Sequence, residues 1–97
     1  MSTSPATAGI DLERAWRLHP QVSVRPEPFG ALLYHFGIRK LSFLKDPRLL
    51  DVVQRLGEEP TALAACRESG VADAELPRFA SALGTLVQSS MIVEGAP

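Results

Sequence analysis

Residues that commonly carry chemistry are scarce in this sequence. Cys66 is the single cysteine, and His19 and His35 are the only histidines. One cysteine cannot form an internal disulfide, and the three residues show none of the spacings of a metal site or of a nucleophile with its base. The seven glycines form no phosphate-binding loop. We therefore expect a protein that is not an enzyme, that has no metal and no cofactor, and whose free cysteine suits a reducing compartment.

The sequence also lacks an excess of charge and a long apolar run. Ten Lys and Arg residues against eleven Asp and Glu residues give a net charge of −1, so there is no electrostatic reason to expect binding to nucleic acid or to an anionic membrane. No stretch approaches the ~18 apolar residues of a membrane-spanning helix. Residues 1–9 have neither the basic start nor the apolar run of a signal peptide. We expect a cytoplasmic protein that binds neither nucleic acid nor membrane.

The length of 97 residues fits one domain. The chain begins with a run of Ser, Thr, Ala, Pro and Gly, which cannot bury enough apolar surface to offset the entropy of ordering. This composition predicts a disordered tail over residues 1–12 and a single folded domain over residues 13–97.

Residues 16–44 carry the signals of β-structure. Alternation with period two predicts a strand over 22–25. Prolines stand on both sides of it, so this strand should be short. The apolar run 31–36 suits a central strand, and Gly37 marks a hairpin turn. The third strand, over 39–44, has apolar and polar residues on both faces. Neither of its faces is therefore fully buried, which places this strand at a sheet edge.

Three helices are predicted after the strands, over about 46–57, 60–68 and 73–90. Asp46 suits an N-cap and Pro47 the first helical position. The third helix has the strongest helical period of apolar residues, and residues 91–93 extend briefly after it. Strands followed by helices indicate the α+β class, and three helices beside a small antiparallel sheet indicate a winged helix-turn-helix.

A winged helix is also a common DNA-binding fold. A recognition helix needs side chains that reach base edges and phosphates. Outside its apolar stripe, the third helix offers only Arg78 and Gln88 for this purpose. A winged-helix DNA-binding regulator therefore remains the alternative function, and a plain structural subunit of a complex is a third.

The third strand suggests a more specific function. An edge strand carries unpaired N–H and C=O groups that can accept an extended peptide as a further strand. Arg39, Lys40 and Lys45 can equally be charges that protect such an edge from pairing. If the edge is open, Leu41 and Phe43 would contact the added strand. The small residues Ala80 and Ala82 would leave room for a groove, and the basic residues would favour an acidic peptide.

Two longer runs carry a family resemblance. Residues 25–36 read RPEPFGALLYHF and residues 39–44 read RKLSFL. Together they resemble the mycofactocin biosynthesis chaperones, which are PqqD-like recognition elements for the precursors of ribosomally made peptides. The resemblance extends over about residues 16–94, and its broader PqqD-like part starts at LHPQVSVR, residues 18–25.

The resemblance implies a fold, two partners and a site. Such proteins have a winged-helix fold with an N-terminal three-stranded sheet. They bind a precursor peptide as a strand added to the third strand, in the cleft next to the third helix, and present it to a radical S-adenosylmethionine maturase. They carry no cofactor themselves. Carried over to this chain, the peptide-binding residues are Arg39, Lys40, Leu41, Ser42 and Phe43 on the strand and Leu76, Phe79, Ala80 and Leu83 on the helix.

Overall fold

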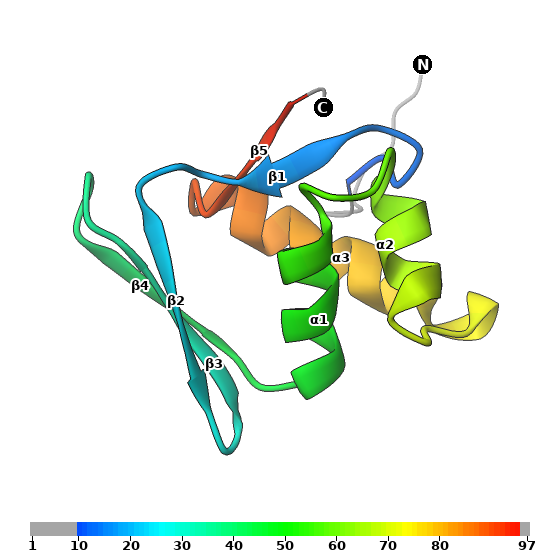
Figure 1. The fold of residues 1–97 in the computed structure, drawn as a ribbon, viewed down its shortest axis with the longest axis horizontal. Coiled ribbons are helices and arrows are strands. Elements are labelled where there is room, and N and C mark those ends of the chain that lie inside the picture. Colours follow the sequence, from blue (N-terminus) through cyan, green and yellow to red (C-terminus); the bar gives the residue numbers. More distant parts are fainter. Residues whose placement is uncertain (1–9, 96–97) are drawn as a thin grey trace.

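The structure of the protein, a computed structural model, describes residues 10–95. Its elements in chain order are β1 (Trp16–Leu18), β2 (Val22–Glu27), β3 (Gly30–His35), β4 (Lys40–Leu44), α1 (Pro47–Arg55), α2 (Ala62–Glu68), a 3₁₀ turn (Asp73–Glu75), α3 (Leu76–Gln88) and β5 (Ile92–Glu94). The predicted α+β class with three helices is confirmed (Figure 1).

The predicted three-stranded antiparallel sheet is present, in the order β2-β3-β4. Its register pairs Tyr34 with Leu41 and Leu32 with Phe43. Strand β2 is longer than predicted because it continues through Pro26, which an edge strand tolerates since one side of it needs no N–H donor. The other edge of this sheet is β4, as the mixed faces of residues 39–44 predicted.

One prediction in the hairpin was wrong. Arg39 lies in the turn before β4 rather than in the strand, and its φ is 58°. Gly37 lies in the same turn, but the left-handed backbone conformation falls on Arg39 and not on the glycine. Gly37 therefore predicted the place of the turn correctly, although the residue with the left-handed conformation is Arg39.

The predicted sheet layout was incomplete. Strand β1 pairs antiparallel with β5, with Trp16 opposite Glu94 and Leu18 opposite Ile92, and forms a separate two-stranded sheet. The strands therefore do not all precede the helices, because the last one returns to the first. Each strand has only three residues, which is too few for an alternating pattern to reveal it. With this layout the winged-helix assignment is not confirmed and stays a prediction.

The helix starts follow their capping residues. The Asp46 carboxylate accepts a hydrogen bond from the Arg48 N–H at 2.9 Å, and Pro47 is the first residue of α1. In α2, the Thr61 hydroxyl accepts a hydrogen bond from the Ala64 N–H at 3.1 Å. The third helix begins at Leu76, after a 3₁₀ turn, within the predicted range for its start.

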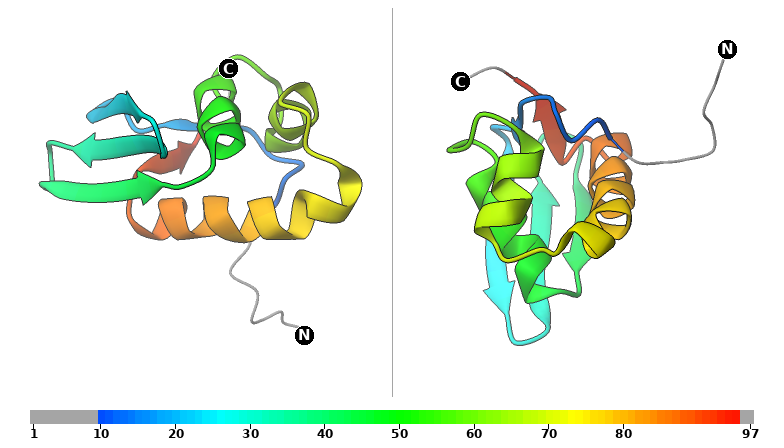
Figure 2. Two further views of the ribbon diagram at one scale, coloured as in Figure 1. Left: turned by 90° about the horizontal axis from the view of Figure 1, so that it is seen from below. Right: turned by 90° about the vertical axis from the view of Figure 1, so that its right-hand side faces the viewer.

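The core lies between the three-stranded sheet and the helices (Figures 1 and 2). Leu33 and Leu44 from the inner face of this sheet are buried with Val52 of α1 and with Leu56, the residue that caps the end of this helix. At the start of the described residues, Leu12 packs against the same core and accepts a hydrogen bond from the Leu63 N–H at 2.8 Å. The packed part of the chain thus includes residues 10–12, which the composition assigned to the tail; residues 1–9 lie outside the described residues.

Candidate functional site

Strand β4 is the edge that borders the helices. Its ladder runs to β3 on one side, and within residues 10–95 no other strand pairs with it. Helix α3 runs along the same side of the molecule as this strand, as the left view of Figure 2 shows. The backbone groups on the free side of β4 are therefore placed to pair with a further extended segment.

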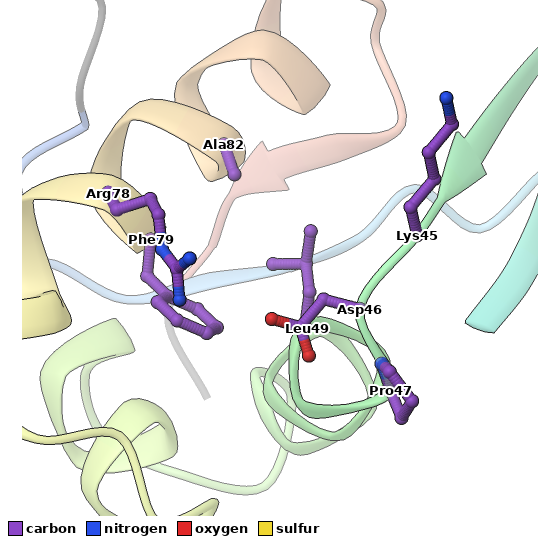
Figure 3. Close-up of a pocket in the computed structure, with 7 residues that line it drawn as sticks. All are labelled: Lys45, Asp46, Pro47, Leu49, Arg78, Phe79 and Ala82. Atoms are coloured by element: carbon purple, nitrogen blue, oxygen red, sulfur yellow. The ribbon is translucent and has the colours of Figure 1, made fainter. Parts of the chain in front are cut away.

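A pocket of about 440 Å³ opens beside this edge. One wall is formed by the junction between β4 and α1 and the other by α3, and the lining residues are Lys45, Asp46, Pro47, Leu49, Arg78, Phe79 and Ala82. Figure 3 shows Phe79 and Ala82 on α3 across the pocket from Leu49 on α1. Ala82 has a short side chain and so takes up little of the pocket. The sequence predicts that a small residue here leaves room for a groove.

Arginine side chains fix the position of the aromatic ring in the pocket wall. Arg48 donates two hydrogen bonds to the Glu75 carboxylate, both at 2.8 Å, and Arg78 donates a third at 3.2 Å. The two guanidinium groups lie 5.4 and 5.5 Å from the centre of the Phe79 ring. At these distances each cation is attracted to the ring. Glu75, the N-cap residue of α3, thus ties this helix to α1 next to Phe79.

This arrangement also shifts ionisation. The hydrogen bonds from Arg48 and from the Ala72 N–H lower the pKa of Glu75 from 4.5 to about 2. The same hydrogen bonds with Glu75 raise the pKa of Arg48. The carboxylate therefore stays charged through the whole mildly acidic range, and the wall of the pocket keeps its geometry there.

The predicted strand residues divide between two faces of the sheet. Leu41 and Phe43 are 55% and 60% exposed and point away from the helices, on the side of their cross-strand neighbours Tyr34 and Leu32. Ser42 alternates with them and is half-buried on the inner side, opposite Leu33.

The predicted helix residues lie in different environments. Phe79 lines the pocket, although only 2% of its surface is exposed. Leu83 is fully buried in the core, and Leu76 and Ala80 lie outside the pocket lining. A helical period marks all of these positions as one apolar stripe, but it does not tell which part of the stripe borders an opening.

The model of the Peptide chaperone MftB family matches residues 15–93 of the chain. The chain belongs to this family. The proteins named "Peptide chaperone MftB" from Mycolicibacterium smegmatis and Mycobacterium tuberculosis are 56% identical over 88 residues and 58% identical over 84 residues. These matches cover 91% and 87% of this chain, and 86% and 77% of the two relatives. No solved structure gives a significant match.

Membership of the MftB family confirms the family predicted from the RPEPFGALLYHF and RKLSFL runs. The relatives are named peptide chaperones, and none of the names refers to DNA. In α3 itself, Arg78 is hydrogen-bonded to Glu75. The DNA-binding alternative therefore gains no support.

The two histidines lie against each other beside the hairpin turn, and the cysteine is buried. His35 is buried, and its Nδ1 accepts hydrogen bonds from the N–H groups of Gly37 and Ile38 at 3.1 and 3.3 Å, which braces the hairpin turn. The His19 ring lies 4.3 Å from the His35 ring, centre to centre. Burial raises the pKa of the Cys66 thiol, which keeps it protonated and unreactive.

The described part of the chain contains neither a candidate metal site nor a helix that could span a membrane. Among residues 10–95, no three His, Cys, Asp or Glu side chains are grouped so that they could hold a metal ion. None of the helices in this range combines the length and the apolar character that crossing a membrane requires.

Proposed function

We propose that this chain is a peptide chaperone of mycofactocin biosynthesis, which binds a ribosomally made precursor peptide as a strand added to β4. The observation that carries the proposal is the position of β4, an edge strand with a free side whose C-terminal end meets a pocket walled by α3. The name of the relatives, peptide chaperone, supports the same reading. Adding a strand to an exposed sheet edge is a recurring way of binding extended peptides.

The backbone of β4 would provide affinity, and side chains on both sides of it would provide specificity. An added strand presents alternate side chains to opposite faces. One set would meet Leu41 and Phe43 on the exposed face, and the other would enter the pocket between Leu49 and Phe79. Leu76, Ala80 and Leu83, which do not line the pocket, would act only by supporting the wall.

Charge would guide the encounter. Arg39 is exposed in the turn before β4, Lys40 is exposed at its first position, and Lys45 is exposed just after its end. These residues would attract an acidic segment and raise the association rate, with an effect that falls as salt is added. The affinity left at high salt would report the backbone pairing and the apolar contacts.

The chemistry would belong to a partner. In this proposal the chain presents the bound precursor to a radical S-adenosylmethionine maturase in the cytoplasm, is not itself an enzyme, and holds no cofactor. Tethering the peptide beside the maturase raises its effective concentration there, so an adaptor of this kind promotes a reaction without performing it. The PqqD-like winged-helix architecture belongs to the same proposal and is supported by the order of the β2–β4 sheet and the three helices.

The proposal is tested by titrating the synthetic precursor peptide into the protein in a calorimeter. Phe43→Asp should weaken binding at least ~10-fold, which corresponds to about 1.4 kcal/mol, because it places a charge on the docking edge. Phe36→Asp is the matched control, since it makes the same change at a side chain 53% exposed in the hairpin turn, away from the free side of β4. Both variants should keep the melting temperature within a few degrees. Unchanged affinity in Phe43→Asp would mean that β4 is not the docking edge.

A further inference from the structure

The exposed face of the three-stranded sheet is unusually apolar. Among residues 10–95, the large hydrophobic side chains with substantial exposure are Phe29, Tyr34, Phe36, Ile38, Leu41 and Phe43, at 37% to 60%. All of them come from β3, β4 or the two turns that join the strands of this sheet. Four of the six aromatic residues of the chain are among them. We call the surface that they form the outward face.

Several of these side chains are neighbours. Tyr34 lies opposite Leu41 in the sheet register, and the rings of Phe29 and Phe43 are 6.2 Å apart, centre to centre. The helices pack on the opposite side of the sheet, so no described element covers this side (Figure 1). With about 200 Å² for each large side chain, half exposure gives a patch on the order of 500–600 Å². Apolar surface of this extent is at the upper end of what a monomer exposes in one patch, and such patches are often binding sites.

Most of the charges around the outward face are basic. No acidic residue occurs between Glu27 and Asp46, whereas Arg39, Lys40 and Lys45 lie in that segment. At the other border of the sheet, Arg25 is paired with Glu27 at 3.0 Å. Two copies of the chain meeting through this face would bring basic borders together, which is unfavourable. A partner with carboxylates around an apolar patch would complement it.

We propose that the outward face docks a folded protein whose contact surface is an apolar patch bordered by carboxylates. The inference rests on the proposed function, in which this partner is the maturase. A strand added to β4 would extend the outward face, because alternate side chains of the added strand point to the same side as Leu41 and Phe43. A partner seated on the face would therefore touch the chaperone and the bound peptide together, in an interface whose apolar centre approaches the ~800 Å² per partner of a stable complex.

The test compares two affinities in the same set of variants. Tyr34→Glu and Phe36→Asp place a charge on the outward face without altering the free side of β4, and Gln54→Glu adds one charge at an exposed position of α1. The purified maturase is titrated with each protein by biolayer interferometry, and the precursor peptide is titrated by calorimetry. We expect Tyr34→Glu and Phe36→Asp to weaken maturase binding at least 10-fold while peptide affinity stays within 2-fold. Gln54→Glu should leave both affinities unchanged.

The outcomes separate this inference from the proposed function. Wild-type protein that binds the peptide but binds maturase equally well in all variants overturns the outward face as the docking surface. Wild-type dimers that Tyr34→Glu converts to monomers, or sedimentation with anionic vesicles that the same variant abolishes, also overturn it by assigning the face to a second copy or to a lipid surface. Loss of maturase binding in Tyr34→Glu, combined with no peptide binding by the wild type, would instead keep the outward face and reject the proposed function. Peptide affinity and melting temperature show in each case that the variant is folded.

Discussion

Replacing Phe79 by alanine tests whether this ring, which also lines the pocket, is packed as a core residue. The ring is 2% exposed, so it buries nearly all of the roughly 200 Å² of an aromatic side chain. At about 25 cal/mol per Å² this gives an upper limit near 5 kcal/mol, and measured Phe-to-Ala losses in cores are about 3–5 kcal/mol. Losing the attraction of Arg48 and Arg78 to the ring adds to this loss. We expect a destabilisation of at least about 4 kcal/mol.

The measurement is the free energy of unfolding from urea titrations followed by circular dichroism. Phe43→Ala is the matched control, because the same atoms are removed from a side chain that is 60% exposed, and it should cost less than about 1 kcal/mol. In a domain of this size a loss of about 4 kcal/mol lowers the melting temperature by roughly 15–30 °C. Equal losses in the two variants, or less than about 1 kcal/mol for Phe79→Ala, would refute the placement of this ring in the core.

Two further predictions concern ionisation and backbone conformation. The pKa of Glu75 is about 2 in the folded protein and 4.5 ordinarily. The stability that the charged carboxylate adds to the fold is therefore present above pH 4.5 and is lost as the pH falls toward 2. In urea titrations, Glu75→Gln should flatten the dependence of stability on pH between these values, and an unchanged dependence would contradict the pairing with Arg48. Gly30 has a φ of 147°, and a Cβ there would lie 2.0 Å from the Leu44 carbonyl oxygen, so Gly30→Ala should destabilise by about 2 kcal/mol or more. Gly57→Ala is its control, since nothing lies within 4 Å of that Cβ position, and it should be neutral or slightly stabilising in thermal melts. A neutral Gly30→Ala would mean that β4 does not approach β3 as closely as described.

Local signals in the sequence were enough for most of the elements. Asp46 and Pro47 placed the start of α1 because an N-cap and a first-turn proline act through the nearest residues only. The mixed faces of residues 39–44 placed β4 at an edge, because a strand with apolar and polar residues on both faces has neither face fully buried. Arg39 was assigned to the strand because nothing in its neighbourhood distinguishes a turn residue with positive φ from the first residue of a strand.

The parts that were missed depend on contacts between distant segments. No short-range pattern links Arg48 to Glu75, although their hydrogen bonds hold α1 and α3 beside the pocket. Asp46 was recognised as an N-cap, and only the position of α1 beside α3 makes Asp46 and Leu49 pocket residues. The pairing of β1 with β5 is the extreme case, because it joins the two ends of the folded chain.

That last pairing bears on when the protein can finish folding. Synthesis runs from the N-terminus, so Trp16–Leu18 is made long before its partner Ile92–Glu94. Contacts between such distant segments form late, because the loop between them must be closed first. A nascent chain that has only reached the end of α3 still lacks the fully buried Met91 and the nearly buried Ile92. Completion of the core therefore waits until Met91 and Ile92 are translated, and a chain that stops after α3 should be more open to proteolysis than one that contains them.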